Sequence, residues 1–248
     1  MRKKPAPENM IYGIRSVIEA IEAGRDLERI FIQKNLKGDL IRELLQRLPG
    51  TNSPVSKVPV ERLNKFTMKN HQGVVAFISP VKYHALEELV TSIFEKGQDP
   101  FFLVLDRITD VRNFGALART AEASGIHGII IPTKNAAQIN ADAVKTSAGA
   151  LNALPVCRVE KIESAVTYLK SSGLSIVSCS EKGNQSLLDT QIQKPVALVL
   201  GSEEDGVSPE LLRISDQICY IPMQGRIASL NVSAAGAIFM YEVVRQNN

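Results

Sequence analysis

Residues 221–240 read IPMQGRIASLNVSAAGAIFM, a polar turn that runs into a helix of unusually small residues. Ser229, Asn231 and Ser233 predict the start of this helix. Their side-chain oxygens can accept hydrogen bonds from the free backbone N–H groups of a first helical turn. The small residues at 234–237 would let another backbone, a ligand or a second subunit come close. Helix capping alone explains one of the polar residues, but not their combination with a small-residue face.

Two other polar loops follow strand-like apolar runs. The run at 101–105 precedes the segment Asn113-Phe-Gly-Ala-Leu-Ala-Arg119, and the run at 196–200 precedes Gly201-Ser-Glu-Glu-Asp-Gly206. A helix-like pattern follows both loops. Ligands of open α/β sheets bind beyond the carboxyl ends of the strands, so the three polar loops are the candidate binding region.

The composition limits the class of protein. The chain has 248 residues, of which 44% are hydrophobic, enough for one large or two small domains with their own cores. No apolar run approaches the roughly 20 residues of a membrane span, and the first residues lack the apolar stretch of a signal peptide, which predicts a soluble, cytoplasmic protein without a membrane partner. Three cysteines without zinc-ligand spacing are interpreted as buried free thiols, and the presence of only three histidines argues against a metal centre.

Charge is distributed unevenly along the chain. Residues 1–80 carry 14 Lys and Arg against 8 Asp and Glu, whereas residues 81–248 carry 15 against 18. A basic amino-terminal part on a mildly acidic remainder indicates a polyanion-binding module attached to a catalytic one. A solvated basic surface without a partner is the equally open alternative.

Residues 1–80 are predicted to form a compact α/β domain that ends at Pro80. The spacing of apolar residues and the Gly and Pro stops predict helices at 9–24, 39–48 and 60–66 and strands at 29–33, 55–58 and 73–78. A further amphipathic helix at 85–96 belongs either to a connector of residues 81–100 or to the start of the next domain.

From residue 101 to the end, strand and helix patterns alternate. Strands are expected at 101–105, 128–131, 154–158, 174–179, 196–200 and 218–221, and helices at 114–124, 139–147, 161–171, 208–214 and 230–246. Nearly continuous apolar strands in such an alternation are typical of a parallel sheet covered by helices on both faces. The predicted fold class is therefore α/β.

Common chemical templates do not fit the loops. No Gly-x-Gly-x-x-Gly follows the first strand, which argues against the usual dinucleotide-binding loop. The loop from Gly201 has the glycine spacing of a P-loop, but Val207 stands where lysine is needed and three carboxylates would repel phosphates. A cationic or zwitterionic ligand suits this loop better. The histidines lie outside the three loops, so no Ser-His-Asp set is visible.

Three ordered motifs carry a family resemblance. Asn113-x-Gly115-x-x-x-Arg119, Leu200-Gly-Ser-Glu203-x-x-Gly206 and Ile221-Pro-Met followed by Ser229-Leu-Asn-Val-Ser233 resemble the motifs of the SpoU (TrmH-type) RNA ribose 2′-O-methyltransferases. The match covers residues 101–248. The segments from Tyr12 to Val17 and from His71 to Ala76 are similar to the L30-like substrate-binding domain that is often fused to this family. The two-domain layout is most similar to bacterial members that methylate a guanosine of 23S rRNA.

The resemblance implies a deep trefoil knot in an α/β-knot (SPOUT) domain, S-adenosylmethionine as cofactor, RNA as partner, a homodimer through the knotted domain, and no metal. In the family the methyl donor is held largely by backbone groups of the second and third motifs. The implied cofactor-binding residues are Leu200, Gly201, Gly206, Ile221, Pro222, Met223, Leu230 and Asn231.

The resemblance also implies roles for catalytic residues. Arg119 would clamp a phosphate and stabilise the developing alkoxide, with action as the base possible only if its neighbours shift it strongly, because arginine normally keeps its proton far above pH 7. Asn113 would cap its helix and orient Arg119. Glu203 would fix the loop geometry or pair with an arginine. Ser229 and Asn231 would shape the donor site, and simple capping or solvation is the alternative for each.

Several functions stay open at this stage. The first is methylation of rRNA, favoured by the dedicated front domain, and the second is methylation of tRNA. A non-catalytic RNA-binding or ribosome-assembly protein would not need the intact set of Asn113, Arg119, Glu203, Ser229 and Asn231. A small-molecule methyltransferase would have no use for a basic front domain.

Overall fold

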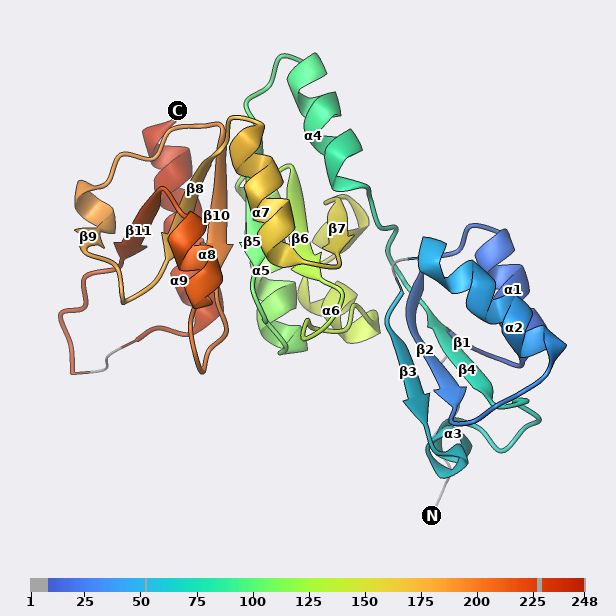
Figure 1. The fold of residues 1–248 in the computed structure, drawn as a ribbon. Coiled ribbons are helices and arrows are strands. Elements are labelled where there is room, and N and C mark those ends of the chain that lie inside the picture. The colour runs from blue at the N-terminus through green and yellow to red at the C-terminus, as the bar shows by residue number, and fades with distance from the viewer. Residues whose placement is uncertain (1–8, 52, 227–228, 248) are drawn as a thin grey trace. The chain divides into compact units, whose positions relative to one another are not determined.

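The computed structural model describes residues 9–51, 53–226 and 229–247 (Figure 1). The chain divides into two compact units, and the boundary falls between Lys82 and Tyr83. None of the helices within the described ranges is long and apolar enough to cross a membrane.

The first unit is a four-stranded sheet with helices on both faces. Its strands β1 (Met10–Tyr12), β2 (Leu27–Gln33), β3 (Val55–Val58) and β4 (Val74–Ile78) lie in the order β1-β4-β2-β3. Strand β4 is antiparallel to both neighbours, and β3 is parallel to β2. The helices are α1 (Ile14–Glu22), α2 (Asp39–Arg47) and α3 (Val60–Phe66), with a 3₁₀ turn at Leu48–Gly50.

The alternation of side chains along the strands gives this sheet two apolar faces. Ile30 and Val74 pack with Val17 of α1 and Leu44 of α2, whereas the neighbouring Phe31 packs on the other face. The helix predicted over 9–24 begins only at Ile14, which corrects that expectation. Met10–Tyr12 pairs with β4, and the left-handed φ of 92° at the intervening glycine separates strand from helix.

The second unit is a seven-stranded sheet in the order β7-β6-β5-β10-β8-β11-β9. Its strands are β5 (Phe101–Leu105), β6 (Gly128–Pro132), β7 (Val156–Val159), β8 (Ser175–Cys179), β9 (Gln185–Ser186), β10 (Val196–Leu200) and β11 (Gln217–Tyr220). All the pairs between these strands are parallel, as the buried apolar runs predicted. Strand β9 was not predicted, because two residues are too few for a periodic signal.

Helices cover both faces of this sheet (Figure 1). One layer consists of α4 (Leu86–Glu95), α7 (Ile162–Ser171) and α8 (Pro209–Ile214), which share a core with β5, β6 and β10. The other contains α5 (Val111–Ala123), α6 (Ala141–Thr146) and α9 (Val232–Gln246), with α5 packed on both of its partners. Short 3₁₀ turns lie at Ala150–Asn152 and Leu187–Asp189.

The segment predicted as a connector, residues 81–100, is divided differently in the structure. Leu86, Val90 and Ile93 of α4 are buried in the core of the second unit. Tyr83 also makes an isolated parallel bridge to Val156 of β7. The helix therefore belongs to the second unit because its apolar face packs on that sheet, and the boundary lies close to residue 82.

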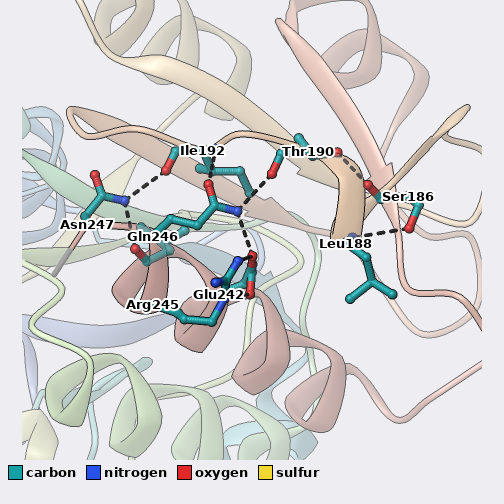
Figure 2. Close-up of polar contacts among 9 residues, drawn as sticks. Ser186, Leu188, Thr190, Ile192, Glu242, Arg245, Gln246 and Asn247 are labelled. Atoms are coloured by element: carbon teal, nitrogen blue, oxygen red, sulfur yellow. Dashed lines mark hydrogen bonds and ion pairs between the residues drawn. The ribbon is translucent and has the colours of Figure 1, made fainter.

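The end of α9 holds the far edge of the second sheet (Figure 2). The Gln246 side chain accepts a hydrogen bond from Ile192 N at 2.7 Å and donates one to Thr190 O at 2.8 Å. Asn247 Nδ2 donates to Ile192 O at 2.8 Å. These side-chain amides replace a missing strand partner for residues 190–192. They fix the segment that follows β9. This segment lies next to β11, the strand that leads to Ile221.

Candidate active site

Four strand ends meet at the carboxyl edge of the second sheet. The loops after β5, β8, β10 and β11 begin at Asp106, Ser180, Gly201 and Ile221, and these strands are neighbours in the order β5-β10-β8-β11. The three polar loops identified in the sequence thus lie at one edge, as expected for ligand sites of open parallel sheets.

Three side chains from these loops join one another directly. Asn113 Nδ2 donates to Glu203 Oε1 at 2.5 Å. Asn231 Nδ2 donates to the same Glu203 oxygen at 3.0 Å and to Asn113 Oδ1 at 3.1 Å. Each residue comes from a different motif, up to 118 positions apart. The triangle of Asn113, Glu203 and Asn231 therefore fixes the relative positions of the three loops.

The helix caps at the site differ in part from the prediction. Asn231 caps α9, since its Oδ1 accepts hydrogen bonds from Ser233 N at 2.9 Å and Ser233 Oγ at 2.6 Å. Asn113 does not cap α5. That role belongs to Asp110, whose Oδ1 accepts from the N–H groups of Arg112 and Asn113, each at 2.8 Å. Asn113 lies inside the helix, so its side chain is left to bind Glu203.

The loop from Gly201 to Gly206 folds back on itself. Ser202 and Gly206 exchange backbone hydrogen bonds of 3.1 and 3.0 Å, and Ser202 Oγ accepts from Asp205 N at 3.1 Å. A Cβ atom on Gly201 would lie 2.0 Å from Gly206 C and from Val207 N, closer than any side chain can approach. Gly206 has a φ of 70°, which glycine adopts at little cost. Both glycines are required by this turn.

A cavity of about 740 Å³ lies against this loop. Its lining includes most of the residues predicted to hold the cofactor: Leu200, Gly201, Gly206, Ile221, Met223, Leu230 and Asn231. Glu203 and Ser229 also line it, whereas Pro222, Asn113 and Arg119 do not. Ala235 and Phe239 of α9 close one wall. Of the small residues at 234–237, Ala235 thus faces the cavity and Gly236 packs inside the chain against Leu117 and Leu200, whereas Ala234 is exposed.

Several lining residues were missed from the sequence. Cys179, Ser180 and Glu181 lie at the end of β8, and Tyr220 ends β11. The signal available was their place at the carboxyl end of predicted strands, but no motif marks them. Burial, with a smaller contribution from Cys219, raises the pKa of the Cys179 thiol well above its ordinary value. The thiol stays protonated, so Cys179 serves as an apolar wall.

A second cavity of about 260 Å³ shares Ser202, Glu203 and Glu204 with the first. Arg107, Asn113, Asn135, Glu203 and Asp205 are among its lining residues. Glu203 is engaged by the two asparagines, and the arginine of this region, Arg107, binds Asp205 instead. Among the described residues, Glu203 thus contacts the two asparagines and no arginine, and its role in fixing the loop stays a prediction.

Arg119 lies on the exposed surface of α5, outside both cavities. It lies six positions after Asn113, which places the two side chains about 120° apart around the helix. Within residues 9–51, 53–226 and 229–247, the Arg119 side chain makes no hydrogen bond or ion pair. Its catalytic role remains a prediction, and its surroundings within a single chain do not explain that role. Over the same ranges, no three His, Cys, Asp or Glu side chains are grouped to bind a metal ion.

Comparison with known proteins identifies the family. The profile of the SpoU rRNA Methylase family matches residues 100–241, more than half of the chain. The chain belongs to this family. A second profile, RNA 2′-O ribose methyltransferase substrate binding, matches residues 10–84 of this SpoU protein. The resemblance of both parts of the sequence is thus confirmed.

Relatives cover nearly the whole SpoU chain. The putative TrmH family tRNA/rRNA methyltransferase YacO of Bacillus subtilis is 32% identical over 96% of both chains. The tRNA/rRNA methyltransferase slr0955 of Synechocystis is 35% identical over 96% of this chain, which spans 62% of that protein's length.

Solved structures agree with this assignment. The SpoU methyltransferase AviRb of Streptomyces viridochromogenes in complex with AdoMet has a TM-score of 0.59 and 26% identity, over 96% of this chain and 89% of its own. The AdoMet-bound rRNA methyltransferase of Sinorhizobium meliloti has a TM-score of 0.61 and 25% identity, over 95% and 86%. They confirm S-adenosylmethionine as the cofactor of the family.

Proposed function

We propose that this SpoU protein is an S-adenosylmethionine-dependent RNA ribose 2′-O-methyltransferase that acts on rRNA, with a guanosine of 23S rRNA as the first candidate. The observation that carries the proposal is the triangle of Asn113, Glu203 and Asn231 beside the cavity of about 740 Å³. It joins all three family motifs at one cavity large enough for a nucleoside-sized cofactor.

The lining of the cavity fits the methyl donor. Glu181, Glu203 and Glu204 place carboxylates around it, which suits a ligand with a sulfonium charge. Leu200 and Ile221 supply apolar surface for an adenosine, and the tight backbone at Gly201 leaves peptide groups free to contact it. S-adenosylmethionine, when bound, supplies an activated methyl group. The chain must therefore orient the ribose oxygen and help it lose its proton.

Arg119 leads us to propose that the site is completed by a second copy of the chain. It is exposed on α5, away from the cavities of its own chain. The neighbouring helix α9 exposes Ile238 at 41% and Tyr241 at 69%. An apolar surface of this kind suits a two-fold contact, through which Arg119 could act on the partner's acceptor.

Mixed subunits test this arrangement. Arg119→Ala, and Gly201→Ala in the donor cavity, should each be nearly inactive as homodimers. If Arg119 acts across the contact, co-refolded equal mixtures should recover about a quarter of wild-type activity, because half the dimers then contain one intact site. Tyr241→Asp should yield a monomer by sedimentation without methyl transfer. A fully active monomer, or no recovery on mixing, contradicts the proposal.

The share of this chain that each solved structure matches favours rRNA over tRNA as the substrate. The rRNA methyltransferase of Sinorhizobium meliloti matches 95% of this chain, including the first unit. The A. aeolicus TrmH/SpoU tRNA modifying enzyme is 30% identical with a TM-score of 0.55 but matches only 65%. The basic first unit is the part that distinguishes them, so we assign RNA selection to it.

Exposed cations in the first unit make this assignment testable. Lys57, Lys65 and Lys69 lie on β3, on α3 and just after α3, and all three are exposed. Changing these three to Gln should weaken rRNA-fragment binding and lower the salt slope by roughly 0.7–0.9 for each phosphate that is no longer neutralised. The matched control, Arg15, Arg25 and Arg42 to Gln, removes the same charge around α1 and α2. Equal losses in both triple variants would show non-specific attraction only.

Ribose-methylation mapping of rRNA and tRNA, in cells with and without the protein, identifies the substrate. Loss of one rRNA methylation is expected. Loss at a tRNA position would establish the tRNA alternative. Unchanged methylation together with retained RNA binding would favour the non-catalytic alternative.

A further inference from the structure

Arg107, which belongs to none of the three motifs, forms a clamp between two of the site loops. It lies directly after β5 and has a φ of 58°, a left-handed conformation that costs energy for a residue with a side chain. Other interactions of Arg107 must offset this energy. Its guanidinium provides them through contacts with both loops that the clamp joins.

The inner end of the clamp is a buried carboxylate. Asp106 is 2% exposed, and its oxygens accept hydrogen bonds from Arg107 Nε at 3.2 Å and Nη2 at 3.3 Å. The same carboxylate accepts Ser208 N at 2.8 Å, from the start of the segment that leads into α8. A buried charge without partners would be costly, so Asp106 holds the guanidinium in place. The carboxylate in turn raises the pKa of Arg107 above its ordinary value.

The outer end grips the loop that carries Glu203. Arg107 Nη1 lies 3.0 Å from Asp205 Oδ2, and Nη2 donates to Gly206 O at 3.0 Å. Lys182 Nζ also donates to Asp205 O at 3.3 Å. Arg107 thus spans from the end of β5 to the last residues of the turn. The turn presents Glu203 to Asn113 and Asn231 and forms one wall of the larger cavity.

We propose that Arg107 is a positioning residue for methyl transfer. Its guanidinium, anchored on Asp106, holds the Ser202–Gly206 turn in the conformation that shapes the donor cavity and aligns Glu203. Planar geometry explains why arginine is required, since a lysine ammonium cannot bridge Asp106, Asp205 and Gly206 O at once. The inference rests on the proposed donor site, and it adds residues that the family motifs do not include.

The sharpest variant is Asp205→Ala. The Asp205 side chain is 69% exposed, so its loss should leave the melting temperature unchanged while it releases one grip on the turn. We expect affinity for S-adenosylhomocysteine, measured by calorimetry, to fall about three- to tenfold, as a partly screened charged hydrogen bond predicts. The single-turnover methyl-transfer rate should fall with it. The matched control is Glu210→Ala, which breaks a comparable exposed pair with Arg213 in α8.

A second pair of variants tests the guanidinium. Arg107→Gly suits the left-handed backbone but removes the clamp, and Arg107→Lys keeps the charge. We expect the glycine variant to lose at least about tenfold in affinity, and the lysine variant to recover only part of it. In the Arg107→Gly, Asp205→Ala double variant, the second substitution should add little, because both break the same clamp.

The outcomes separate this inference from the proposed function. If wild-type protein fails to bind S-adenosylhomocysteine, the donor site itself is wrong. If wild type binds and Asp205→Ala equals wild type and Glu210→Ala in affinity and rate, Arg107 merely neutralises Asp106 and the inference is overturned. Additive losses in the double variant would also overturn it.

Discussion

Asn231→Ser separates the two tasks of one side chain. Asn231 Oδ1 caps α9 by accepting from Ser233 N at 2.9 Å, while its Nδ2 binds Glu203 at 3.0 Å and Asn113 at 3.1 Å. A serine hydroxyl can take over the cap. It is too short to reach the other two residues. The variant should therefore keep the helix and lose the triangle.

The magnitudes follow from these hydrogen bonds. Serine caps a helix about as well as asparagine, so Asn231→Ser should lower the free energy of unfolding only by what the two lost hydrogen bonds contributed. Asn231→Ala also loses the cap and should be about 1 kcal/mol less stable than Asn231→Ser, or about 2–4 °C lower in melting temperature for a unit of this size. The two hydrogen bonds that both variants remove contribute about 1–2 kcal/mol together at an exposed site. Methyl transfer by either variant should therefore fall about five- to thirtyfold.

Thermal unfolding, calorimetry with S-adenosylhomocysteine and single-turnover methyl transfer measure the two effects. Asn140→Ala is the control: Asn140 Oδ1 caps α6 by accepting Ala143 N at 3.0 Å, outside the lining of both cavities. It should lower the melting temperature and leave donor affinity unchanged. If Asn231→Ser melts as low as Asn231→Ala, or transfers methyl at the wild-type rate, the separation of roles is wrong.

Three other substitutions test the site and its sheet. Gly201→Ala should abolish donor binding and lower stability by about 1–3 kcal/mol, because its Cβ meets backbone at 2.0 Å; wild-type calorimetry would contradict this. Arg119→Ala should leave melting temperature and donor affinity unchanged but reduce single-turnover transfer at least about a hundredfold, and near wild-type rates would make Arg119 structural. Burial, then the charge of Lys194, lowers the pKa of His127, whose Nδ1 accepts Phe101 N at 3.1 Å. Because unfolding lets this imidazole take up a proton, stability should fall as pH drops below about 6.5, and less so in His127→Gln; parallel pH-melting curves would refute it.

Periodicity predicted most of the elements, because their signals are local. The buried strands at 101–105 and 196–200 are reproduced to the residue. The exceptions are short pieces whose partners lie far away in sequence. Met10–Tyr12 reads as helix in isolation and becomes strand only by pairing with β4, and α4 becomes part of the second unit only by packing on its sheet.

Residue identities at the site were predictable only where a motif or a backbone constraint marks them. Gly201 and Gly206 are required by the turn they form, and Asn231 combines capping with the triangle. The identity of the helix cap was not predictable, because Asp110 and Asn113 are both good caps and only the folded geometry selects one. The clamp at Arg107 carries no sequence signal, since its partner Asp205 is 98 positions away.

The sequence alone determined the α/β class, the alternation of parallel strands with helices along the chain, and the positions of the three polar loops. These features depend on apolar spacing and glycine stops, which are signals within a few residues. Tertiary structure alone decided which loops share a cavity, that Glu203 pairs with two asparagines, and that Arg119 lies outside the site of its own chain. The physical reason is that hydrogen bonds, burial and charge pairing depend on distances in space. These distances are fixed only when the sheet has set the order of its strands, so spacing along the chain does not predict them.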